Sequence, residues 1–137
     1  MIKILVLCTG NSCRSQIAEG YLKLFLKGKA QVLSAGTKNH EINKYAIETM
    51  KCDGIDISTH SSNNVSEFKK IKFDYVITVC DHAKETCPIF ISNSATKIHK
   101  NFFDPSSITN PEKIKGAFEL CRDEIKKFCY DFSKNLN

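Results

Sequence analysis

The chain has 137 residues, of which 42% are hydrophobic and 26% are charged, and its formal net charge is +5. This length and composition are typical of one globular domain, residues 1–137, and no apolar run approaches the ~20 residues that a membrane-spanning helix needs. The positive net charge suits a small anionic substrate or an acidic partner. Because the lysines are spread along the chain rather than clustered with aromatic residues, we expect no nucleic acid, and we expect no membrane.

The predicted secondary structure alternates between strands and helices along the chain. Short apolar runs predict four strands, at 2–7, 30–36, 74–80 and 96–99. Apolar residues at helical spacing predict three helices, at 15–27, at 43–54 with Gly54 as its end, and along a stripe from Ile114 to Phe132. This alternation predicts an α/β fold with a four-stranded parallel sheet and helices on both faces.

Two cysteines stand at the ends of predicted strands. Cys8 follows the first apolar run, and Cys80 closes the strand at 74–80. Ligands of parallel sheets bind beyond the carboxyl ends of the strands, so these two thiols are expected to share one edge of the sheet. The chain has seven cysteines in all, an odd number, and its N-terminal apolar run is too short for a secretory signal peptide. We therefore expect reduced thiols in a cytoplasmic protein.

The loop from Cys8 to Arg14 is typical of an anion-binding cradle. A loop that leads from a strand into a helix directs successive N–H groups into one concavity. Gly10 permits backbone angles that other residues resist, and Asn11 tolerates positive φ. Arg14 could grip two oxygens of a tetrahedral anion, and all these donors would lower the pKa of Cys8. The alternative is that Cys8 is only a small buried residue at a strand end.

The motifs of the chain together resemble one family. The segment CTGNSCRSQIAEGYL at 8–22 is similar to the low-molecular-weight protein tyrosine phosphatases and, more closely, to the thioredoxin-coupled arsenate reductases built on the same fold. Further motifs follow in the family's order: SAGT at 34–37, DISTHSS at 56–62, VITVCDHAKETCP at 76–88, FDP at 103–105 and RDEI at 122–125. The resemblance implies a flavodoxin-like winding of the sheet. It also implies an oxyanion-binding loop formed by Thr9, Gly10, Asn11, Ser12, Cys13, Arg14 and Ser15.

The resemblance further implies a reaction, the reduction of arsenate to arsenite. In that reaction Cys8 attacks arsenic, and Asp104, held by the following proline, protonates the leaving oxygen. Cys80 then attacks the Cys8 adduct and releases arsenite, and Cys87 attacks Cys80. The resulting Cys80–Cys87 disulfide is implied to be reduced by thioredoxin. Phosphate and sulfate are expected to compete with arsenate, and the enzyme is expected to be a monomer.

Two other functions stay open at this point. A tyrosine phosphatase acting on phosphotyrosine or small aryl phosphates would use the same loop, and residual phosphatase activity would be compatible with a reductase. However, Asp104 is followed by PSSITNP, without the aromatic residues that phosphatases of this family usually carry there. An oxyanion-binding or redox-sensing module without turnover is the third possibility. The intact nucleophile and acid disfavour it.

The pair Cys80 and Cys87 also has two structural interpretations. Both residues could be core cysteines, as we expect for Cys121 and Cys129 on the stripe of the last helix. They could also bind a metal together with His82, but the spacing matches no common zinc pattern. The polar stretch that ends at Cys87 instead indicates an exposed mobile loop, which favours the redox role.

Several other residues are candidates for the site. Asp104 before proline could simply begin a turn, and the Ser15 hydroxyl could stabilise the Cys8 thiolate. The histidines at 40, 60, 82 and 99 show no metal or triad spacing, so none is assigned a catalytic role.

Some arsenate reductases of this type hold a potassium ion, and the matching positions are Asn11, Glu19, Ser34, Ser61 and Asn63. Because Asn63 replaces an aspartate of that pattern, we expect no metal, and we expect no other cofactor.

Overall fold

The four predicted strands form one sheet, which we describe from a computed structural model covering residues 1–38, 40–88, 91 and 93–136. All pairs are parallel, and the strand order is β2-β1-β3-β4. The strands are β1 (Ile2–Cys8), β2 (Ala30–Gly36), β3 (Tyr75–Thr78) and β4 (Thr96–His99). The predicted four-stranded parallel sheet is thus confirmed, and the order is that of a flavodoxin-like winding.

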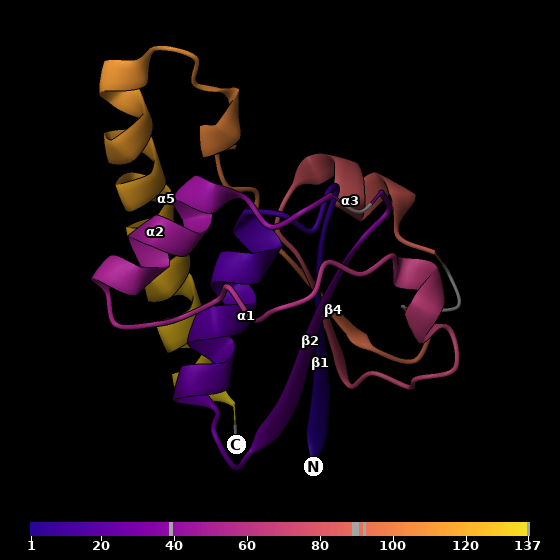
Figure 1. Ribbon diagram of the computed structural model, residues 1–137. Coiled ribbons are helices and arrows are strands. Elements are labelled where there is room, and N and C mark those ends of the chain that lie inside the picture. Colours follow the sequence, from indigo (N-terminus) through magenta and orange to yellow (C-terminus); the bar gives the residue numbers. More distant parts are fainter. Residues whose placement is uncertain (39, 89–90, 92, 137) are drawn as a thin grey trace.

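The helices surround this sheet. The α-helices are α1 (Arg14–Phe25), α2 (Lys44–Cys52), α3 (Asp81–Thr86) and α5 (Pro111–Asn135), and the short 3-10 helices are η1 (Val65–Phe68) and η2 (Pro105–Ser107). In Figure 1, α1, α2 and α5 lie on one side of the sheet, and α3 lies near the carboxyl ends of the strands, toward the other side. Within the described ranges, no helix is both long and apolar enough to cross a membrane.

Local sequence signals explain where most elements begin and end. The α2 helix begins after Asn43, whose Oδ1 accepts hydrogen bonds from the N–H groups of Tyr45 at 2.8 Å and Ala46 at 3.3 Å. It ends just before Gly54, whose φ of 79° only glycine adopts at little cost. The long α5 helix has Pro111 at its first position and Asn110 as its cap. The helices predicted at 43–54 and from Ile114 onward are confirmed within a few residues.

The stretch between Cys80 and Cys87 differs from the prediction of an exposed mobile loop. Residues 81–86 form α3, and Cys80 caps it, because its Sγ accepts the N–H of Ala83 at 3.4 Å. Cys80 is only 4% exposed, and Cys87 is half-buried. A helix of six residues is too short to produce a recognisable apolar period, so its stability depends on this cap and on packing against β1 and β3.

The carboxyl ends of the strands bring the candidate site together. Cys8 is paired with Gly36 of β2, and Leu7 is paired with Thr78 of β3. The approach at Gly36 is so close that a Cβ there would lie 2.5 Å from the carbonyl oxygen of Thr9. Glycine is therefore required at this position for the loop to pass over the end of β2.

Candidate active site

The loop from Cys8 to Arg14 directs its carbonyl groups away from its centre. The carbonyl oxygens of Thr9, Gly10 and Ser12 accept N–H groups of Lys38 at 2.9 Å, His40 at 2.9 Å and Asn43 at 2.8 Å, respectively. Because the N–H and C=O of a peptide unit point in opposite directions, these bonds leave the N–H groups of the loop facing its interior. Together with the N-terminus of α1, they form a concavity suited to an oxyanion.

Asn11 holds this loop in shape from the inside. It is fully buried and has a φ of 51°, as expected from the sequence. The positive φ falls on Asn11 and not on Gly10, the other residue expected to relax the backbone. The Nδ2 of Asn11 donates to the hydroxyl oxygens of Ser15 and Ser34, each at 2.9 Å, and its Oδ1 accepts the N–H of Asn63 at 2.7 Å. The amide thus ties the loop to α1, to β2 and to the segment before η1.

The thiol of Cys8 lies against the thiol of Cys80, and the two titrate as a pair. The hydrogen bond from Cys8 lowers the pKa of Cys80 to about 5, assisted by the Thr9 hydroxyl and the N–H of Ala83. Thr9 Oγ1 lies 3.3 Å from Cys80 Sγ. Conversely, the bond to Cys80, together with burial, raises the pKa of Cys8, although Arg14 acts in the opposite direction. The pKa of Cys8 is therefore raised in this arrangement, not lowered as expected, because its thiol bonds to Cys80 and is buried.

Arg14 and Asp104 meet at the mouth of the loop. The guanidinium of Arg14 donates from Nη1 to the carbonyl oxygen of Phe102 at 2.9 Å, and its Nη2 lies 3.7 Å from Asp104 Oδ2. Burial alone would lower the pKa of Arg14, but Cys8 and Asp104 outweigh this effect and raise it. Asp104 also caps η2, since its Oδ1 accepts the N–H of Ser106 at 3.0 Å. The carboxyl group is thus both the start of a turn and a group facing the loop.

The residues that match a potassium site form hydrogen bonds with one another. Ser34 donates its hydroxyl to Glu19, whose other oxygen lies 2.6 Å from the Nζ of Lys23. Asn63 donates from Nδ2 to the Ser61 carbonyl oxygen at 3.2 Å and to the Ser61 hydroxyl oxygen at 3.1 Å. The Ser61 hydroxyl also donates to Asn63 Oδ1 at 3.2 Å, so both ends of the Asn63 amide pair with Ser61. Among the described residues, no cluster of His, Cys, Asp and Glu could hold a metal ion.

The remaining candidates lie as follows. Cys13 caps α1 without a side-chain hydrogen bond and is buried, which raises the pKa of its thiol. Ser15 is bonded to Asn11, and a bond from its hydroxyl to Cys8 stays a prediction. Cys121 and Cys129 are buried in the core, and burial raises the pKa of Cys121 to about 12, which suits the structural role expected for them.

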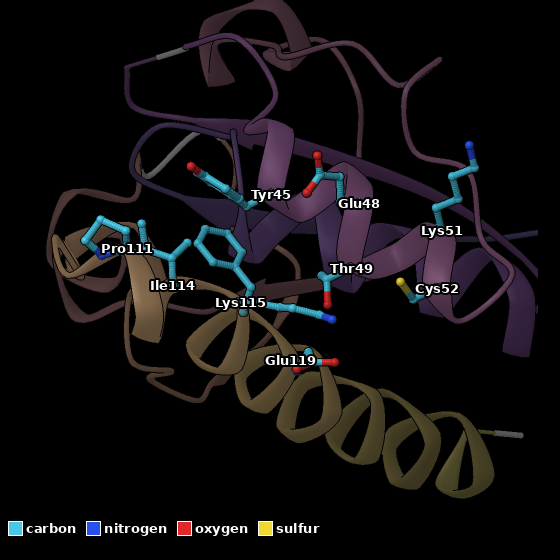
Figure 2. A pocket seen from close by; sticks show the side chains of 10 residues that line it. Tyr45, Glu48, Thr49, Lys51, Cys52, Pro111, Ile114, Lys115 and Glu119 are labelled. Atoms are coloured by element: carbon cyan, nitrogen blue, oxygen red, sulfur yellow. The ribbon is translucent and has the colours of Figure 1, made fainter.

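A pocket of about 690 Å³ lies outside this site, between α2 and α5. Figure 2 shows Tyr45, Ile114 and Pro111 at one end of it and a mixture of charged and uncharged side chains, among them Thr49 and Cys52, along the rest. None of the residues of the loop, and neither Cys80 nor Cys87, lines this pocket. The pocket is therefore separate from the loop and its neighbouring thiols.

Replacing Cys80 with serine should lower the pKa of Cys8. In the native pair the bond to Cys80 and the charge of Cys80 both raise the pKa of Cys8, whereas a serine hydroxyl carries no charge and can donate to the Cys8 thiolate. The pH dependence of the alkylation rate of Cys8, followed by peptide mass mapping, measures this shift. Cys52→Ser, which changes an exposed thiol at the end of α2, is the control and should leave the profile unchanged. An unchanged midpoint in Cys80→Ser would contradict the pairing of the two thiols.

The fold and the loop together define a class: α/β proteins with a cysteine thiol in an anion-binding loop at the carboxyl edge of a parallel sheet. The family described as low molecular weight phosphotyrosine protein phosphatase matches residues 3–137. The chain belongs to this family.

Within this family, the chain is similar to curated relatives and to solved structures that are named arsenate reductases. The chain is 46% identical to "Arsenate reductase 1" of Staphylococcus epidermidis over 97% of this chain and 96% of the relative. It is 42% identical to "Arsenate reductase" of Halalkalibacterium halodurans over 96% of this chain and 94% of the relative. A solved arsenate reductase in the oxidized state covers both chains completely, with a TM-score of 0.83 and 26% identity. The tyrosine phosphatase Wzb of Escherichia coli K30, solved with sulphate, has a TM-score of 0.82 at 23% identity over both full chains, which shows the shared fold.

Proposed function

We propose that the protein is an arsenate reductase that uses Cys8, Cys80 and Cys87 in turn and is recycled by thioredoxin. The observation that carries the proposal is the contact between Cys8 and Cys80 at the end of β1. A second thiol of lowered pKa stands next to the nucleophile, where a reductase needs it and a phosphatase does not. The curated relatives, which are arsenate reductases at 46% and 42% identity, support the same choice.

In the first step the loop binds arsenate through its N–H groups and Arg14. The Cys8 sulfur attacks arsenic as a thiolate, and an As–O bond breaks. Asp104, which lies beside Arg14 at the mouth of the loop, supplies the proton that lets the oxygen leave as water. Because the pKa of Cys8 is raised in the pair, its thiol must lose a proton before the sulfur can attack. Solvent is the acceptor for this proton.

In the second step two electrons pass from the thiols to arsenic, and in the third step the disulfide moves to Cys87. The Cys80 thiolate attacks Cys8 Sγ, a disulfide forms, and arsenic departs with the electron pair of the broken As–S bond as arsenite. The Cys87 thiolate then attacks Cys80 Sγ and releases Cys8 as a thiolate, which restores the nucleophile. The low pKa of Cys80 supports its role as the attacking group in the second step.

The Cys80–Cys87 disulfide is the form that a dithiol donor must reduce. Thioredoxin is the donor we propose, and its two thiols return the two electrons. We place the reaction in the cytoplasm, because thiols are kept reduced there. We also propose that the enzyme works as a monomer, because all the residues of the relay and the loop belong to one chain.

One comparison of two assays tests the proposal. The protein with thioredoxin, thioredoxin reductase and arsenate should oxidise NADPH, and hydrolysis of an aryl phosphate should be slow beside it. Cys8→Ser is the control and should abolish both activities. Efficient hydrolysis without arsenate-dependent NADPH oxidation would overturn the reductase and favour the phosphatase.

A further inference from the structure

Three residues from three elements connect α3 to the sheet. His99, the last residue of β4, lies with its Nδ1 2.7 Å from Thr78 Oγ1 and its Nε2 2.7 Å from Asp81 Oδ1. Thr78 is the last residue of β3, and Asp81 is the first residue of α3. A carboxylate can only accept, so the Nε2–H of His99 donates to Asp81, while its Nδ1 pairs with the Thr78 hydroxyl. We call these three residues the His99 latch.

A second contact fastens the same end of α3. The backbone N–H of Asp81 donates to Asn101 Oδ1 at 3.2 Å. Asp81 is therefore held by its side chain from the end of β4 and by its backbone from the segment that follows. Asp81 directly follows Cys80, whose sulfur reaches Thr9 in the anion-binding loop. By fixing Asp81, the His99 latch also fixes the backbone next to Cys80 and so helps to orient the Cys80 thiol toward the anion-binding loop.

The proposed Cys80–Cys87 disulfide is incompatible with an intact α3. These two cysteines are the caps at the two ends of the six-residue helix. With a rise of 1.5 Å per residue, their Cα atoms are roughly 10 Å apart along it, whereas a disulfide needs about 4.4–6.8 Å. A helix of six residues has too few internal hydrogen bonds to persist in part, so forming the disulfide opens it as a whole.

A cleft beside the His99 latch offers space for α3 to open when the Cys80–Cys87 disulfide forms. A cleft of about 340 Å³ lies between α3 and the strands β3 and β4. Cys87 lines it, and so do Thr78 and His99. The amino groups of Lys84 on α3 and Lys97 on β4 are the cationic groups of the same cleft.

We propose that His99 is a positioning residue for the cysteine relay: through Asp81 it latches α3 in the helical, dithiol form and so opposes formation of the Cys80–Cys87 disulfide. This inference rests on the proposed function, because it concerns the third step of that relay. The latch keeps Cys80 directed at the Cys8 loop until the disulfide opens α3. It also makes the disulfide easier for the donor to reduce, because the reduced form regains the latch.

His99→Phe tests the latch, because phenylalanine keeps a ring of similar shape and has neither nitrogen. In a Cys8→Ser background, where Cys87 is the remaining relay partner of Cys80, the protein is equilibrated with oxidised and reduced dithiothreitol, and the disulfide is identified by peptide mapping. We expect the equilibrium to shift about fivefold toward the Cys80–Cys87 disulfide, which is about 20 mV for two electrons. In the reduced protein the backbone amides of α3 should exchange their hydrogens about fivefold faster.

Two further variants separate positioning from general stability. His99→Gln, whose side-chain amide can still donate to Asp81, should recover part of both effects. His82→Phe changes an exposed histidine on α3 itself and should behave like the native protein. Faster exchange throughout β3 and β4 as well as α3 would mean that His99 only stabilises the fold, and it would overturn the latch.

The redox measurement distinguishes failure of the latch from failure of the relay. A Cys80–Cys87 disulfide that forms with the same constant in both proteins, with unchanged exchange of α3, would overturn the latch alone. Absence of that disulfide in both proteins at every dithiothreitol ratio would overturn the relay, and the latch with it.

Discussion

A Cys87→Ser variant should release about one arsenite per enzyme molecule and then stop, with Cys8 and Cys80 joined in a disulfide. The first two steps of the proposed relay need only Cys8 and Cys80, which are already in contact. The third step needs a sulfur at position 87, and a serine hydroxyl does not reduce a disulfide. The amount of arsenite released in the burst measures the first part of this result. Peptide mapping under non-reducing conditions identifies the Cys8–Cys80 disulfide.

A Cys80→Ser variant should stop one step earlier, and it is the matched control for the burst. Without a thiol beside Cys8, nothing displaces the arsenic from Cys8, so little or no arsenite should appear. Although Cys80 is buried, the variant should remain folded, because serine is a favoured helix cap and can accept the N–H of Ala83 in place of the sulfur. Sustained thioredoxin-driven turnover by Cys87→Ser would rule out the three-cysteine relay, even with arsenate as the substrate.

An Arg14→Lys variant should lose about a hundredfold or more in kcat/KM for arsenate, a few kcal/mol of transition-state stabilisation. Arginine donates to the Phe102 carbonyl through one nitrogen and still presents further N–H groups to an oxyanion. The ammonium group of lysine lacks the planar fork of the guanidinium, so it loses the two-pronged grip on two oxygens. Steady-state kinetics with arsenate, together with protection of Cys8 from alkylation by phosphate, measure the loss.

The same substitution elsewhere in the chain is a direct control. Arg122 on α5 donates to the Thr49 carbonyl oxygen at 3.1 Å and takes no part in the loop. Arg122→Lys should therefore stay within about twofold of the native rate. A near-native rate in Arg14→Lys would mean that the oxyanion is bound elsewhere.

The sequence alone determined the sheet, the long helices and the position of the loop, because these depend on local signals. The apolar run of β1 contains the fully buried residues 4–7, and Asn43 and Gly54 mark the ends of α2 by their own hydrogen-bonding and backbone preferences. The positive φ of Asn11 was predictable for the same reason. Such preferences act between residues that are close in the chain, so they can be recognised without knowledge of the fold.

Only the tertiary structure decided how the thiols and the histidines of the site interact. Thr9 contacts Cys80 across 71 positions, and His99 reaches Asp81 across 18. The α3 helix, the low pKa of Cys80 and the raised pKa of Cys8 follow from these contacts. A pKa depends on the charges and donors within a few ångströms of a group, and in a parallel sheet those neighbours come from strands that are separated in sequence by whole helices.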